Sequence, residues 1–144
     1  DPVRTVAVET LFDTSRRRVV MTTPATAPEW RDAAHALFAA DGKPVTVIRD
    51  SAGLIAQRVV ATIVNIAADI AQQRIATPAD IDRAVALGLN YPFPPLAWGD
   101  RIGARTVLTI LERMHAFYGD ARYRPSPWLK RRALLGLSLL TEES

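Results

Sequence analysis

The sequence predicts a mainly α-helical domain over residues 50–144, preceded by a small α/β segment over residues 1–49. Long stretches after residue 50 carry apolar residues at helical spacing, most clearly between residues 51 and 75. The first 49 residues instead contain short apolar runs typical of strands, separated by one helical pattern. With 49% hydrophobic residues, the 144-residue chain has enough apolar side chains for a sizeable core.

The composition also excludes several classes of protein. The chain has no cysteine, which excludes disulfides, thiolate catalysis and cysteine-ligated metals. No uncharged apolar run is long enough to span a membrane, and no signal peptide is visible. Asp1-Pro2 is not a natural start. We therefore expect a cytoplasmic piece of a longer chain, without membrane contact.

The first segment combines three strand patterns with one helix pattern. Strands are expected over residues 3–11, 18–22 and 45–48, and an amphipathic helix is expected over residues 27–40. A strand, a helix and a strand in this order favour a right-handed crossover between two parallel strands.

Residues 51–75 form the longest periodic segment and carry two apolar stripes. The first stripe consists of Ile55, Val59, Ile63, Ile66 and Ile70. The second consists of Leu54, Val60, Val64, Ala67 and Ala71. Apolar cover this wide indicates a helix that is buried on more than one side. One stripe should pack on the domain's own helices, and the other on another subunit or domain.

A proline-rich turn separates the next two expected helices. Thr77 is placed to cap the first helix, and Pro92, Pro94 and Pro95 prevent that helix from continuing. A short helix should follow from about Leu96 and end at Gly103, with Trp98 packed beneath the turn.

Three motifs in order resemble the C-terminal domain of the L-3-hydroxyacyl-CoA dehydrogenases, which include the 3-hydroxybutyryl-CoA dehydrogenases. Asp50–Arg58 is similar to the family's Asp-x-Pro-Gly-Phe-x-x-Asn-Arg, and Tyr118–Leu129 is a second local match. Between them lies the family's Ile-Asp-x-Ala, Gly-x-Gly-x-Pro-x-Gly-Pro-Phe and Asp-x-x-Gly pattern. The residues here that match it are Ile81, Asp82, Ala84, Gly88, Pro92, Pro95, Asp100 and Gly103.

The resemblance implies a helical domain of the 6-phosphogluconate dehydrogenase C-terminal-like type, with residues 1–49 as the remnant of a Rossmann fold. Two family features are missing from the sequence: the Gly-x-Gly-x-x-Gly turn that binds a dinucleotide, and the His-Phe-Phe-Asn-Pro context of the catalytic histidine. These departures suit the second, degenerate module of a two-module bacterial enzyme. NAD is then expected in the parent enzyme, and no cofactor, metal or catalytic residue in this chain.

Gln57 is the one site-like residue. It stands where the family has an asparagine that reaches the reacting end of the substrate, so the resemblance makes Gln57 a candidate substrate-facing residue. A glutamine moves the amide by one methylene, and errors of about 1 Å can cost a catalyst on the order of 10²-fold. The alternative is a polar residue in a first helical turn, and the missing histidine and glycine turn favour that alternative.

The two histidines and the two basic clusters are explained best as surface residues without a role at a site. His35 and His115 lie in helical patterns without a partner motif, which favours surface positions. Residues 16–18 and 130–132 are basic and could meet an anionic partner such as nucleic acid or the phosphates of coenzyme A. A solvated turn and an exposed helix face explain them better, because no aromatic residues are interleaved and the net charge is only +3. We expect no nucleic-acid partner.

The resemblance therefore implies a substrate-cleft and dimerisation module of an NAD-dependent dehydrogenase that converts 3-hydroxyacyl-CoA to 3-ketoacyl-CoA. Its partners would be a second copy or the preceding modules of the parent chain, with acyl-CoA as the parent's substrate. Ile55, Val59, Ile63, Ile66 and Ile70 are the expected dimer interface. A free-standing, non-catalytic helical interaction module is the alternative.

Overall fold

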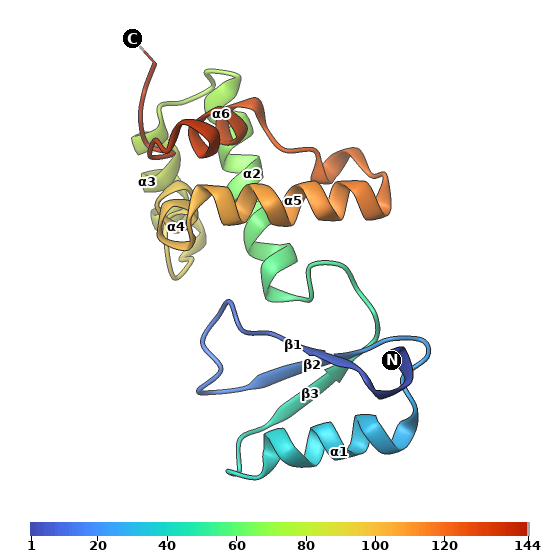
Figure 1. Ribbon diagram of the computed structural model, residues 1–144. Helices are drawn as coiled ribbons and strands as arrows, with labels where there is room; N and C mark the ends of the chain where they lie inside the picture. The colour runs from blue at the N-terminus through green and yellow to red at the C-terminus, as the bar shows by residue number, and fades with distance from the viewer. Residues whose placement is uncertain (144) are drawn as a thin grey trace. The chain divides into compact units, whose positions relative to one another are not determined.

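The structure, a computed structural model, describes residues 1–143. It divides into two compact units, Asp1–Ala56 and Gln57–Ser144 (Figure 1). The domain boundary expected at residue 50 lies slightly upstream of this division, inside the linker that follows the last strand. The mainly helical fold class with a small sheet is as predicted.

The first unit is a three-stranded sheet with one helix. Its elements are η1 (Pro2–Arg4), β1 (Val6–Val8), β2 (Arg18–Thr22), α1 (Pro28–Ala39) and β3 (Val45–Ile48). The strand order is β1-β2-β3, with β1 antiparallel and β3 parallel to β2. The predicted parallel pair joined by a helix is thus confirmed.

The first strand is shorter than the predicted 3–11 segment. The carboxylate of Asp1 accepts a hydrogen bond from the backbone amide of Val3 at 3.0 Å, and Pro2 begins a 3₁₀ turn. This local capping keeps residues 2–4 out of the sheet, since Pro2 has no amide hydrogen to donate to a ladder.

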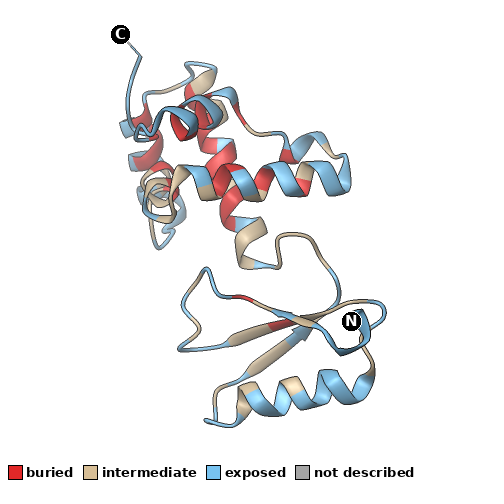
Figure 2. Cartoon of the chain, in the orientation of Figure 1, coloured by how far each residue is buried: buried red, intermediate tan, exposed pale blue. Residues whose placement is uncertain are grey.

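Burial in the first unit is shallow (Figure 2). Val20 is its one fully buried apolar side chain among the described residues, and α1 has no buried residue. Polar contacts fasten α1 to the sheet: Arg18 donates to the Phe38 carbonyl and forms an ion pair with Asp41 at 2.7 Å. The Arg18 hydrogen bond holds the pKa of the Asp41 carboxyl well below its ordinary value.

The second unit is a helical bundle. Its elements are α2 (Ala56–Gln72), α3 (Pro78–Leu89), α4 (Pro95–Ile102), α5 (Ala104–Tyr118), η2 (Ala121–Tyr123) and α6 (Pro127–Leu135). The Thr77 hydroxyl caps α3 by accepting from the Asp80 amide at 3.2 Å, as predicted. Asn90 ends α3 in the left-handed conformation, and Gly103 separates α4 from α5.

The helix α2 is shorter than the predicted segment of residues 51–75. Gly53 and Leu54 have positive φ angles of 80° and 47°, so the chain turns before the helix begins. Arg74, with φ of 57°, interrupts the other end. Helical φ angles are negative, so the helix cannot continue past Leu54 or Arg74, although the apolar spacing in the sequence does continue there.

The core of the second unit lies between α2, α4, α5 and α6 (Figure 2). Its fully buried large side chains are Val64, Leu96, Val107, Leu111, Met114, Leu129 and Leu139. Gly99 lies at the tightest approach: a Cβ atom there would lie 2.5 Å from Leu139 Cδ1 and 2.7 Å from Val64 Cγ1. The helix α4 therefore packs closely against α2 and the C-terminal segment at Gly99, which has no side chain.

Candidate functional site

The two stripes of α2 have opposite environments. Val60, Val64, Ala67 and Ala71 of the second stripe are buried in the helical unit. In the first stripe, Ile55 is 49% exposed, Val59 is 51% exposed and Ile66 is 57% exposed. Ile63 and Ile70 are half-buried. An apolar ridge therefore runs along the outer side of α2, formed by Val59, Ile63, Ile66 and Ile70; Ile55 precedes the helix.

An apolar groove runs beside this ridge, between α2 and α3. Its volume is about 120 Å³, and its lining contains no charged side chain. The α2 side is formed by Ile63, Ile66, Ala67 and Ile70, and the other side by Ile81, Val85, Leu89, Tyr91 and Pro95. Leu89 is 58% exposed and Tyr91 is 37% exposed. We call the ridge and this groove together the α2–α3 face.

The opposite flank of α2 is polar. A hollow of about 320 Å³ lies there, and Ile66 and Ile70 line it as well as the apolar groove. Its other lining residues are Asn65, Asp69, Gln73, Ala121, Arg122 and Arg124. The apolar surface is thus bounded on this side by charges of both signs.

Gln57 lies in the first turn of α2 and is half-buried. The next residue, Arg58, donates from its guanidinium to the Tyr118 hydroxyl at 2.5 Å and lies over that ring, 5.1 Å from its centroid. Contact with the end of α5 thereby anchors this turn. A role for Gln57 at a substrate stays a prediction.

Two acidic residues of the family motif have structural partners. The Asp82 carboxylate accepts from the backbone amides of Leu96 at 2.7 Å and Ala97 at 2.9 Å, which caps α4. Asp100 accepts from the Leu139 amide at 2.8 Å and the Ser138 hydroxyl at 2.5 Å. These carboxylates hold the scaffold together.

Asn65, on α2, is a buried polar residue that binds the backbone of the segment before α6. Its amide donates to the Arg124 carbonyl at 2.9 Å, and its carbonyl accepts from the Ser126 amide at 2.7 Å. Ser126 precedes α6, but its hydroxyl makes no capping hydrogen bond. Asn65 therefore binds the backbone at the start of α6, where the Ser126 side chain forms no cap.

The two histidines and the basic residues at 130–132 do not form a common site. His35 is exposed and His115 is half-buried, on separate units. The expected exposed face at residues 130–132 is wrong for Arg132, which is 3% exposed and donates to the Thr141 carbonyl at 2.9 Å. Burial lowers the pKa of the Arg132 guanidinium, although Glu143 opposes the shift. Arg132 thus fastens the C-terminal segment to α6.

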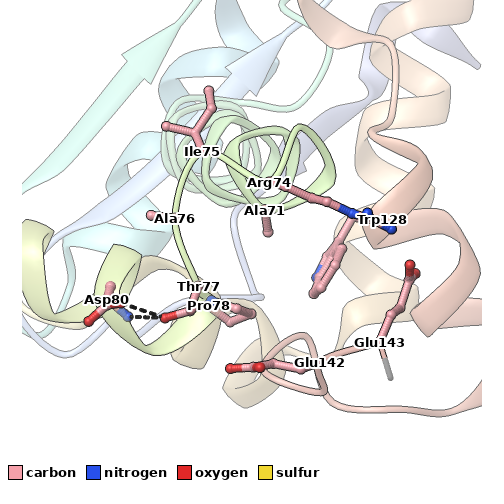
Figure 3. A pocket seen from close by; sticks show the side chains of 10 residues that line it. All are labelled: Ala71, Arg74, Ile75, Ala76, Thr77, Pro78, Asp80, Trp128, Glu142 and Glu143. Atoms are coloured by element: carbon pink, nitrogen blue, oxygen red, sulfur yellow. Dashed lines mark hydrogen bonds between the residues drawn. The ribbon is translucent and has the colours of Figure 1, made fainter.

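A hollow of about 690 Å³ lies between the end of α2, the start of α3, Trp128 and the C-terminal residues (Figure 3). Three of its polar side chains serve the fold: Asp80 shares a hydrogen bond with the capping Thr77 hydroxyl, and Glu143 pairs with Arg131 at 3.1 Å. Over residues 1–143, no three His, Asp or Glu side chains gather as metal ligands would. Within that same range, no helix is long and apolar enough to cross a membrane.

Comparison with known proteins places this arrangement in a family. Residues 53–139 match the family described as 3-hydroxyacyl-CoA dehydrogenase, C-terminal domain. The 3-hydroxyadipyl-CoA dehydrogenase of Escherichia coli K12 is 47% identical over 94 residues, which are 65% of this chain and 20% of that protein. A probable 3-hydroxybutyryl-CoA dehydrogenase of Bacillus subtilis is 38% identical over 90 residues, covering 62% of this chain and 31% of that protein.

Similarity in structure reaches further along the chain. A crystal structure of 3-hydroxybutyryl-CoA dehydrogenase from Escherichia coli K12 matches 90% of this chain with a TM-score of 0.79 and 35% identity. This chain covers 27% of that chain. The (S)-3-hydroxybutyryl-CoA dehydrogenase from Ralstonia eutropha shares the fold, with a TM-score of 0.81 over 91% of this chain. The chain thus belongs to the family of 3-hydroxyacyl-CoA dehydrogenase C-terminal domains and spans less than a third of the curated relatives named above.

Proposed function

We propose that this chain is the C-terminal substrate-cleft and dimerisation module of an NAD-dependent L-3-hydroxyacyl-CoA dehydrogenase. The parent enzyme would oxidise a 3-hydroxyacyl-CoA to the 3-ketoacyl-CoA in the cytoplasm, with NAD bound by another module. The family match over residues 53–139 carries the proposal. The names of the relatives, which act on 3-hydroxyadipyl-CoA and 3-hydroxybutyryl-CoA, support this substrate class.

Different residues of this chain would have different roles in the parent enzyme. The motif carboxylates Asp82 and Asp100 are engaged by backbone amides, so they contribute shape and not proton transfer. The ridge of α2 supplies an apolar surface for association with a second copy or with a preceding module. Gln57, in the anchored first turn of α2, is the one candidate in this chain for a substrate-facing residue.

Kinetics of the parent enzyme test this proposal. The full-length polypeptide is assayed for NADH formation with a series of 3-hydroxyacyl-CoA thioesters of increasing chain length. We expect turnover of at least one member. A folded parent enzyme that reduces NAD with none of them would refute the dehydrogenase assignment and favour a non-catalytic interaction module.

Gln57 is tested within the same enzyme. A Gln57→Leu variant should lower kcat/KM at least tenfold, because an apolar side chain cannot hydrogen-bond the substrate's oxygen. Gln73→Leu, at the exposed residue directly after α2, is the matched control and should keep full activity. Equal kcat/KM values for Gln57→Leu and the unaltered enzyme would remove Gln57 from the substrate site.

A further inference from the structure

Two residues that lie 60 positions apart in the sequence, one from each of two family motifs, meet in the helical unit. The guanidinium of Arg58, which ends the Asp50–Arg58 motif, donates to the hydroxyl of Tyr118 at 2.5 Å. Its central carbon lies 5.1 Å from the centroid of the Tyr118 ring. A charge-assisted hydrogen bond and a cation–π contact between the same two side chains fix both their distance and their orientation.

Tyr118 has a well-supported position at the end of α5. Its ring packs on Tyr123, with ring centroids 5.4 Å apart, and meets Phe117 edge to face at 4.9 Å. Tyr123 is 8% exposed and therefore belongs to the core of the unit. Arg58 thus binds to a side chain that the core holds in place.

The first turn of α2 depends on such a support, because it extends beyond the buried part of the helix (Figure 2). Buried residues of α2 begin at Val60, whereas Gln57 and Arg58 are half-buried. Leu54, two residues before the helix, has a φ angle of 47°, so the helix does not continue upstream. Core packing therefore constrains this turn less than it constrains the rest of α2.

We propose that Arg58 and Tyr118 are positioning residues for Gln57: their contact fixes the rotation of the first turn of α2, and with it the direction of the Gln57 amide. Successive residues of an α-helix point about 100° apart, so fixing one residue fixes the direction of its neighbour. This inference rests on the proposed substrate-facing role of Gln57. It adds to that role the requirement that Gln57 be held in place from α5.

Removal of the Tyr118 hydroxyl isolates this effect. Tyr118→Phe keeps the ring and its packing on Tyr123, but the hydrogen bond to Arg58 is lost. Misplacing a reacting group by about 1 Å can cost a catalyst on the order of 10²-fold in rate, so we expect kcat to fall about five- to tenfold. KM should change by less than about twofold, because the parts of the substrate remote from Gln57 are bound as before.

A double-mutant cycle in the full-length parent enzyme tests the inference, because a purely structural role of Tyr118 would lower activity whatever residue occupies position 57. Tyr118→Phe should lower kcat/KM in the natural background and change it by less than about twofold in the Gln57→Leu background. Thr109→Val, which removes a hydroxyl from the exposed side of α5, is the matched control and should leave kcat and KM unchanged.

Two results would overturn the inference. One is a natural kcat/KM for Tyr118→Phe, and the other is a loss that is equally large in the natural and the Gln57→Leu backgrounds. Either result leaves the dehydrogenase proposal intact, since both require a natural enzyme that reduces NAD with a 3-hydroxyacyl-CoA. A natural enzyme that reduces NAD with none of these thioesters would refute the dehydrogenase proposal itself, and with it the role of Gln57.

Discussion

The carboxylate of Asp82, on α3, accepts a hydrogen bond of 2.7 Å from the backbone amide of Leu96, on α4. The second carboxylate oxygen accepts from the next amide, at 2.9 Å. Asp82 is 8% exposed and Leu96 is fully buried. One motif residue therefore both caps α4 and sets the position of α4 across the proline turn.

Replacing Asp82 with Ala should destabilise the helical unit by about 1–3 kcal/mol, because two backbone amides lose their acceptor. Urea unfolding followed by circular dichroism measures the change. Glu112→Ala, on the exposed side of α5, is the control and should shift the free energy of unfolding by less than about 0.5 kcal/mol. Equal midpoints for the two variants would show that the cap contributes nothing.

Gly99→Ala should destabilise the chain by about 1–3 kcal/mol through overpacking, since Leu139 and Val64 must both move to admit a methyl group. Gly88→Ala is the matched control: it lies in α3, and a Cβ atom there meets nothing within 4 Å. That substitution should stabilise the helix by about 0.5–1 kcal/mol. If the melting temperature of Gly99→Ala is equal to or above that of the natural chain, α4 is not packed as tightly as the structure shows.

Trp98 is half-buried and lies against Phe93, with ring centroids 5.6 Å apart. Trp98 is therefore packed beneath the turn but is not fully buried. Trp98→Ala should cost about 1–2 kcal/mol, below the roughly 3–5 kcal/mol of a fully buried tryptophan. Leu96→Ala, at a fully buried position, should cost more. Thermal melts that rank the two variants in the reverse order would contradict the burial described here.

The chain alone should not bind NAD, because its sequence has no glycine-rich turn for the pyrophosphate. Isothermal titration of NAD into the chain should give only heats of dilution. The full-length parent enzyme provides the positive control. Micromolar binding to the isolated chain would mean that a nucleotide site exists outside the recognised motif.

Most helix bounds could be predicted because caps and breakers are local. The pattern of residues 104–118 and the Pro127 start of α6 predict both helices as they stand in the structure. The ends of α2 could not be placed, since the positive φ angles at Leu54 and Arg74 occur at residues without that preference. The late start of β1 results from a side-chain contact of Asp1, which periodicity does not reveal.

The site was only partly predictable for a related reason. Helical periodicity separates the two stripes of α2, but the groove depends on where α3 and the proline turn lie relative to α2. The buried positions of Asn65 and Arg132 depend on backbone groups 59 and nine residues away, respectively. Polar residues on a helix are usually exposed, so the sequence alone favours surface positions for both.

Sedimentation velocity of the natural chain at micromolar concentration, beside Ile66→Glu and Leu135→Glu, tests the central claim that the α2–α3 face is an association surface. We expect a dimer for the natural chain and for Leu135→Glu, whose substitution lies on exposed α6 surface. Ile66→Glu should be a folded monomer, because a buried, unpaired carboxylate at the contact is costly. A natural chain that stays monomeric with α2 intact, or a dimer that Ile66→Glu leaves unchanged, would contradict the account.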